Sequence, residues 1–101
     1  MRRAAKVDAN QGEIVDALRA VGAKVQPLHM VGEGVPDLLV RYRGDLHLVE
    51  VKDGRKPPSD RRLTPAQLAW HLEWAGADLH VVKSVAEALI AIGAKIVSDP
   101  Y

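Results

Sequence analysis

The chain has 101 residues, of which 14 are basic, 13 are acidic and 48% are hydrophobic. This length and apolar fraction fit one compact domain over residues 1–101 and exclude a largely disordered chain. The absence of cysteine excludes disulfides and thiolate metal sites. No run approaches the ~18 apolar residues of a membrane span, and no apolar segment follows the basic start. We therefore expect a soluble intracellular protein.

The pattern of apolar residues predicts helices and strands in alternation along the chain. Apolar positions spaced by three or four predict helices, and short alternating or continuous apolar runs predict strands. In chain order we expect helix 9–21, strands 24–28, 37–42 and 46–52, helix 65–75, strand 78–83 and a last helix ending at Gly93. The helix before the last strand allows a parallel crossover, so the sequence predicts an α/β domain with a mixed central sheet flanked by helices.

Three helix starts carry the signature of a capping box, in which an N-cap side chain and a residue three positions later satisfy free backbone N–H groups. The second is the clearest, because proline occupies the first helical position after it. The three predicted pairs are Asp8 with Gln11, Thr64 with Gln67, and Ser84 with Glu87.

Two acids and a lysine lie at the ends of the strands of the predicted hairpin. If the turn is 43–44, Asp37 lies directly across from Glu50; if the turn is 44–45, Asp37 faces Lys52. Either register places all three side chains on one face of the sheet. Opposed carboxylates need positive charge between them, which Lys52 supplies in part and Mg²⁺ or Mn²⁺ supplies more fully. A surface salt-bridge cluster is the alternative interpretation.

The loop over 53–63 is basic, and Pro57-Pro58 excludes a helix through it. Its cations are suited to phosphate contacts with DNA, although solvated surface charge explains them equally well. The residues concerned are Arg55, Lys56, Arg61 and Arg62.

The aromatic residues and histidines are assigned structural roles. Trp70 and Trp74 are expected to pack in the core rather than to stack on bases, because the chain has no phenylalanine. No two of the four histidines have the spacing of a helical or strand metal motif, so we interpret them as structural or incidental. They are His29, His47, His71 and His80. No phosphate-binding loop or nucleophile elbow is present, so no nucleotide cofactor is expected.

Four segments in this order resemble a known superfamily. They are "VPD" at 35–37, "EVK" at 50–52, "LTPAQLAWH" at 63–71 and "GADLHVVKS" at 76–84. The combination resembles the PD-(D/E)XK nucleases, and within them the small stand-alone VRR-NUC domains of phages and bacteria, over residues 10–92. The resemblance implies a restriction-endonuclease-like αβββαβ core.

The resemblance also implies roles for individual residues. Asp37 and Glu50 would bind the metal together with the backbone carbonyl of Val51, and Lys52 would orient or deprotonate the attacking water. Gln67 matches a glutamine of the narrower family, although its capping box explains it equally well. Glu13 matches an acid that these domains bring from the first helix; Asp16 competes for that role, and a solvated helix face explains both residues.

The implied activity is that of an Mg²⁺- or Mn²⁺-dependent DNA endonuclease that leaves 5′-phosphate and 3′-hydroxyl ends. A domain this small is expected to act as a homodimer, with the four-way (Holliday) junction ranked first as substrate, in the cytoplasm of a bacterial or phage-infected cell. The alternatives are a flap-specific or general nickase, a non-catalytic nucleic-acid-binding module of the same fold, and an interaction subunit with a coincidental motif.

Overall fold

The computed structural model describes residues 7–95 and confirms the predicted order of elements. One four-stranded sheet has the order β1-β2-β3-β4, in which β1–β2 and β2–β3 are antiparallel and β3–β4 is parallel. No helix in this part of the chain is both long and apolar enough to cross a membrane. The elements are α1 (Gln11–Ala20), β1 (Lys24–Pro27), β2 (Leu38–Tyr42), β3 (Asp45–Val51), the 3-10 turn η1 (Pro58–Arg61), α2 (Pro65–Glu73), β4 (Leu79–Val82) and α3 (Val85–Ala91).

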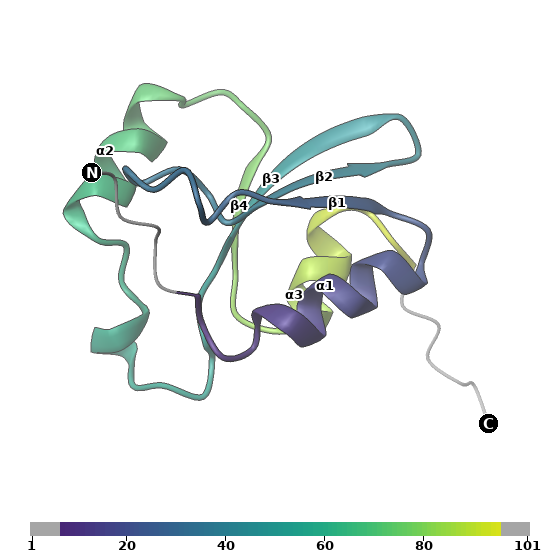
Figure 1. The fold of residues 1–101 in the computed structure, drawn as a ribbon, viewed down its shortest axis with the longest axis horizontal. Helices are drawn as coiled ribbons and strands as arrows, with labels where there is room; N and C mark the ends of the chain where they lie inside the picture. The colour runs from purple at the N-terminus through teal and green to yellow at the C-terminus, as the bar shows by residue number, and fades with distance from the viewer. Residues whose placement is uncertain (1–6, 96–101) are drawn as a thin grey trace.

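Helices α1 and α3 lie together on one side of the sheet and enclose the core with it (Figure 1). The strands contribute alternate residues to this core, as a half-covered sheet does. On β3, Val49 and Val51 are fully buried against the helices, and Ile14 and Leu18 of α1 meet them from the other layer. The core is aliphatic, as expected for a chain without phenylalanine.

Helix α2 lies apart from this core and has no buried residue (Figure 1). The prediction that the tryptophans pack in the core is wrong, since Trp74 is 52% exposed and stacks on Trp70 with ring centroids 5.0 Å apart. The physical reason is that α1 and α3 already fill the covered face of the sheet with small aliphatic side chains. The tryptophans therefore pack on each other.

The hairpin turn selects one of the two predicted registers. Arg43 and Gly44 have φ angles of 51° and 86°, and two consecutive residues with positive φ make a type I′ turn. Tyr42 then pairs with Asp45, and Leu38 with Val49. This is the register in which Asp37 and Glu50 are directly opposed.

The helix caps differ in part from their predictions. The Thr64–Gln67 capping box is complete, but Asp8 does not cap α1, whose N-cap position is taken by Asn10 without a side-chain cap bond. Ser84 caps α3 as predicted, whereas the Glu87 carboxylate accepts from the N–H of Lys83 and not from that of Ser84.

The loop 53–63 contains one short element that the sequence did not predict. Pro58 occupies the first position of the 3-10 turn η1, where its missing N–H costs no hydrogen bond. The two prolines therefore exclude a continuous helix but allow a single turn after them.

Gly34 sets how closely the loop before β2 approaches α2. A Cβ atom at this position would lie 2.2 Å from the carbonyl oxygen of Ala66, in the first turn of the helix. Only a glycine backbone therefore fits between the loop and the helix. Gly44 has a similar φ angle but open space around its missing Cβ.

We predict that Gly34→Ala lowers the free energy of unfolding by about 1–3 kcal/mol more than Gly44→Ala does. Both variants introduce Cβ at positive φ, which costs about 1 kcal/mol, and only Gly34→Ala adds a backbone clash. Urea unfolding of the two variants measures the difference. Equal losses would contradict the close contact with α2.

Candidate active site

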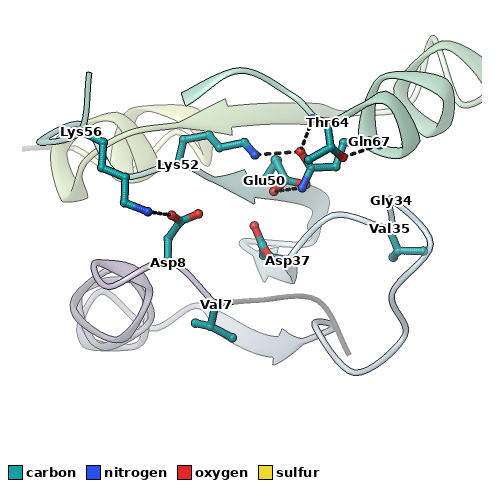
Figure 2. A pocket seen from close by; sticks show the side chains of 10 residues that line it. All are labelled: Val7, Asp8, Gly34, Val35, Asp37, Glu50, Lys52, Lys56, Thr64 and Gln67. Carbon is teal, nitrogen blue, oxygen red and sulfur yellow. Dashed lines mark hydrogen bonds and ion pairs between the residues drawn. The ribbon is translucent and has the colours of Figure 1, made fainter. Parts of the chain in front are cut away.

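Asp37 and Glu50 face each other where β2 and β3 leave the core. The β2–β3 register, continued by one position past Leu38–Val49, pairs these two residues. Both are buried, with exposures of 6% and 1%, yet both line a pocket (Figure 2). The other lining residues come from the segment before α1, the loop before β2, the loop after β3 and the start of α2, and are Val7, Asp8, Gly34, Val35, Lys52, Lys56, Thr64 and Gln67.

Glu50 is the electrostatically strained member of this pair. Burial, together with the adjacent Asp37 carboxylate, raises the pKa of Glu50 to about 9, although the ammonium of Lys52 acts in the opposite direction. Its Oε1 atom is buried and has no hydrogen-bond partner among the described residues. An ionised Glu50 would be stabilised by positive charge in addition to that of Lys52, since a buried carboxylate oxygen without a partner is costly.

Asp37 is held by the backbone of the strand opposite. Its Oδ2 accepts a hydrogen bond of 2.7 Å from the N–H of Val51, so the backbone of Val51 faces β2. The carbonyl of the same residue faces that side too, as the geometry of strands requires. The residue opposite in the continued register is Pro36, which has no N–H to donate to this carbonyl. The side chain of Asp37 thus takes the place of a backbone acceptor in the hydrogen bonds between the two strands.

Gln67 joins the helix cap to the pocket. Its Oε1 accepts from Lys52 Nζ at 2.7 Å and from the N–H of Thr64 at 2.9 Å, and its Nε2 donates to Glu50 Oε2 at 3.3 Å (Figure 2). The two interpretations of Gln67 are therefore compatible, because one amide completes the capping box and contacts both strand residues. The bond from Lys52 Nζ to Gln67 Oε1 also holds the ammonium of Lys52 beside the carboxylates.

The acid that the N-terminal segment brings to the pocket is Asp8. It lines the pocket and pairs with Lys56 Nζ at 3.2 Å, whereas Glu13 lines a neighbouring pocket beside Arg55. Asp16 is exposed on α1. Glu13 is therefore not among the residues that line the pocket of Asp37 and Glu50, and its predicted role gains no support from its position.

Asn10 explains why the N-terminal segment reaches this place. Its buried Nδ2 donates to the carbonyls of Lys52 and Lys83 at 3.0 and 3.2 Å, which ties the start of α1 to the ends of β3 and β4. Sequence reasoning missed both Asp8 and Asn10. A polar residue just before a helix looks the same in the sequence whether its side chain caps that helix or bonds to a distant strand.

The basic loop lies next to the pocket but its cations differ in their surroundings. Arg55 bonds to Asp53 at 3.0 Å, which raises the pKa of Arg55 and lowers that of Asp53. Arg61 has a buried Nε without a partner among the described residues, and Arg62 is exposed. Of the four predicted residues, only Lys56 lines the pocket itself.

The pocket fits a hard divalent cation. It offers two opposed carboxylates and a backbone carbonyl on the same side, which is the oxygen set that Mg²⁺ and Mn²⁺ prefer. The unpartnered Oε1 of Glu50 and the raised pKa of its carboxyl are the observations that favour a bound cation.

We predict that Glu50→Gln stabilises the metal-free protein at pH 8. The folded-state pKa of Glu50 lies above its ordinary value of 4.5, so folding favours the neutral acid. Its contribution to stability is complete below pH 4.5 and is lost as the pH rises towards 9. Urea unfolding in EDTA should show a gain for Glu50→Gln that is larger at pH 8 than at pH 5.

The matched control is Glu73→Gln, which removes the same charge from the exposed side of α2. It should leave stability almost unchanged at both pH values. A wild-type protein that matches Glu50→Gln at pH 8 would contradict the electrostatic strain at Glu50.

Comparison with solved structures identifies a similar chain. A structure described as a VRR_NUC domain shares 33% sequence identity with this chain and superposes with a TM-score of 0.58. The match covers 82% of this chain and 96% of the other. No protein-family model and no curated protein sequence matches the chain. This structural match, together with the αβββαβ order, confirms the restriction-endonuclease-like fold, and the chain belongs to the VRR-NUC family of the PD-(D/E)XK nuclease superfamily.

Proposed function

We propose that this protein is a divalent-metal-dependent endonuclease that hydrolyses phosphodiester bonds in DNA. The observation that carries the proposal is a buried carboxylate oxygen of Glu50 that has no hydrogen-bond partner in the described part of the chain and lies opposite Asp37 and beside Lys52. A protein that only bound DNA would gain nothing from two opposed acids facing an anionic backbone. The membership of the chain in a family named for a nuclease domain supports the same activity.

Asp37, Glu50 and the carbonyl of Val51 would hold Mg²⁺ or Mn²⁺. Such an ion supplies a Lewis acid for the phosphoryl oxygen and lowers the pKa of bound water. The residues of the chain itself contribute position and charge. Gln67 keeps Lys52 Nζ at 2.7 Å from its own Oε1, so the ammonium stays in the pocket and can orient the attacking water.

Lys52 also stabilises the charge that develops during hydrolysis. A phosphodiester already carries a negative charge, and attack by water adds more to the phosphoryl oxygens. A buried ammonium is effective here because it is screened little by solvent. Lys56 lines the pocket, whereas Arg55, Arg61 and Arg62 do not, and we propose all four as contacts to the flanking phosphates.

We further propose that the enzyme acts as a homodimer on four-way DNA junctions. Two exposed apolar side chains of α2, Leu68 and Leu72, lie one helical turn apart on the same side of the helix. A twofold contact of α2 with its copy would bury this surface. It would also bring together two copies of the helix that supplies Gln67 to each pocket.

Two other functions fit the same residues. A flap-specific or general nickase would use the same pocket as a monomer. A non-catalytic nucleic-acid-binding module of the same fold would keep the basic loop without needing Glu50. Glu13 stays a predicted catalytic residue, and Asp8 is the acid from the N-terminal segment whose position in the pocket supports a direct role.

We predict that Asp37→Asn and Lys52→Ala each lower DNA cleavage by about 100-fold or more while the proteins stay folded. The assay uses labelled four-way junction, flap and linear duplex DNA with Mg²⁺, Mn²⁺ or EDTA. Asp45→Asn and Lys24→Ala, at exposed positions outside the pocket, are the matched controls and should cleave as the wild type does.

The pattern of products separates the candidates. Paired, metal-dependent cuts in the junction support the proposed resolvase. Cuts confined to flaps, or unpaired nicks, would keep the active site and reject the junction. Salt-sensitive binding without cleavage would reject the enzyme and leave the binding module.

We predict that Leu72→Glu converts a dimer into a monomer, because it places charge within the apolar surface of α2. Ile90→Glu on α3 is the matched control, since Ile90 is 66% exposed and Leu72 is 69% exposed. Sedimentation equilibrium measures the mass of each variant. A wild-type protein that is monomeric at every concentration, or equal behaviour of the two variants, would reject this interface.

A further inference from the structure

Three side chains that can bind metals meet at the β4 edge of the sheet. The Asp78 carboxylate lies between two imidazoles: its Oδ2 contacts Nδ1 of His47, and its Oδ1 lies 2.6 Å from Nε2 of His80. One ligand atom from each residue lies within 4.8 Å of the other two. The two rings are tilted, with centroids 5.9 Å apart.

The parallel register of β3 and β4 brings these residues together. Val49 pairs with His80, and the same register continued backwards pairs His47 with Asp78. Paired residues share a face of the sheet, so all three side chains lie on the face that carries Val49. His47 and Asp78 are 31 residues apart in the sequence, which hides this arrangement. Of the two interpretations of His47 and His80, structural or incidental, the cluster favours the structural one.

His47 is the most buried member of this cluster. His47 is buried, and its Nε2 has no hydrogen-bond partner among the described residues. The other two members are more accessible, since the side chain of Asp78 is 47% exposed and that of His80 is 31% exposed. A small ion can therefore reach the cluster from solvent while one ligand stays fixed in the core.

We propose that His47, Asp78 and His80 form a second metal site, which binds a transition-metal ion of the Zn²⁺, Co²⁺ or Ni²⁺ class. Two imidazole nitrogens and one carboxylate oxygen are the ligands of three-residue zinc sites. Mg²⁺ prefers oxygen ligands throughout, so this set discriminates against the ion expected at Asp37 and Glu50. The ligands of the cluster therefore favour Zn²⁺, Co²⁺ or Ni²⁺ over Mg²⁺.

The side chains need only a small movement to admit the ion. Ligands about 2.1 Å from a tetrahedral metal lie about 3.4 Å apart, whereas His80 Nε2 and Asp78 Oδ1 are now 2.6 Å apart. Rotation of the exposed Asp78 and the half-buried His80 would open this gap without moving the buried His47. Solvent would complete the coordination on the open side of the edge strand.

The site is separate from the acidic pocket. Side chains alternate along β3, so His47 and Glu50 point to opposite faces of the sheet, and they lie about 10 Å apart along the strand. A metal at the cluster would cross-link β3 to the edge strand β4. We infer a structural clamp, which stabilises the strand that also carries Glu50 and Lys52.

The experiment titrates metal-free protein with Co²⁺, followed by visible absorption, and with Zn²⁺, followed by calorimetry. The protein carries Asp37→Asn and Glu50→Gln, so that the acidic pocket contributes no binding. We expect one ion per chain in this background, unaffected by millimolar Mg²⁺. His80→Ala and Asp78→Asn should weaken binding by at least about tenfold, and the matched control His71→Ala on α2 should not.

A second measurement needs no variant of the cluster and therefore does not depend on the folding of His80→Ala or Asp78→Asn. Ring ¹⁵N–¹H spectra of the wild-type protein report each histidine separately. Zn²⁺ should shift the ring nitrogens of His47 and His80 and leave those of His29 and His71 unchanged. Absence of saturable binding, equal binding by His80→Ala and the background protein, or shifts at His29 or His71 instead would each overturn the proposal and leave a hydrogen-bonded cluster.

Discussion

The opposition of Asp37 and Glu50 across the hairpin is the constraint on which the rest of the site depends. It follows from one backbone feature, the type I′ turn at Arg43-Gly44, because a two-residue turn at 44–45 would place Asp37 across from Lys52 instead. The covered face of the same hairpin fills the core with Val49 and Val51. Core packing and site geometry are therefore set by a single register.

Burial of this pair creates an electrostatic cost that the surrounding residues relieve only in part. The N–H of Val51 donates to Asp37 and Gln67 donates to Glu50, yet one oxygen of Glu50 has no partner within residues 7–95. A fold selected for stability alone would place an apolar or amide side chain there. The cost is consistent with a pocket whose charges are balanced only when a cation and an anionic ligand enter it.

Local signals in the sequence predicted the features that depend on neighbouring residues. The hairpin could be counted through its turn, and the Thr64–Gln67 box follows from spacing alone. Features that depend on distant parts of the chain were missed. Asp8 was assigned to a helix cap because nothing near it reveals that Asn10 bonds to Lys52 and Lys83. The size of the tryptophans predicts core positions for them, but burial depends on which helix covers the sheet.

The isolation of α2 has a consequence for the energetics of the active site. A helix of nine residues is marginal in water, and this one has no buried side chain to hold it. Its capping box, the contact at Gly34 and the bonds of Gln67 are what anchor it to the domain. Opening of this segment alone would release Lys52 and Glu50 from Gln67 while the β-sheet and its core stayed intact. If α2 opens locally, the fraction of molecules in which Gln67 holds Lys52 and Glu50 would follow that local equilibrium and not the global stability of the sheet.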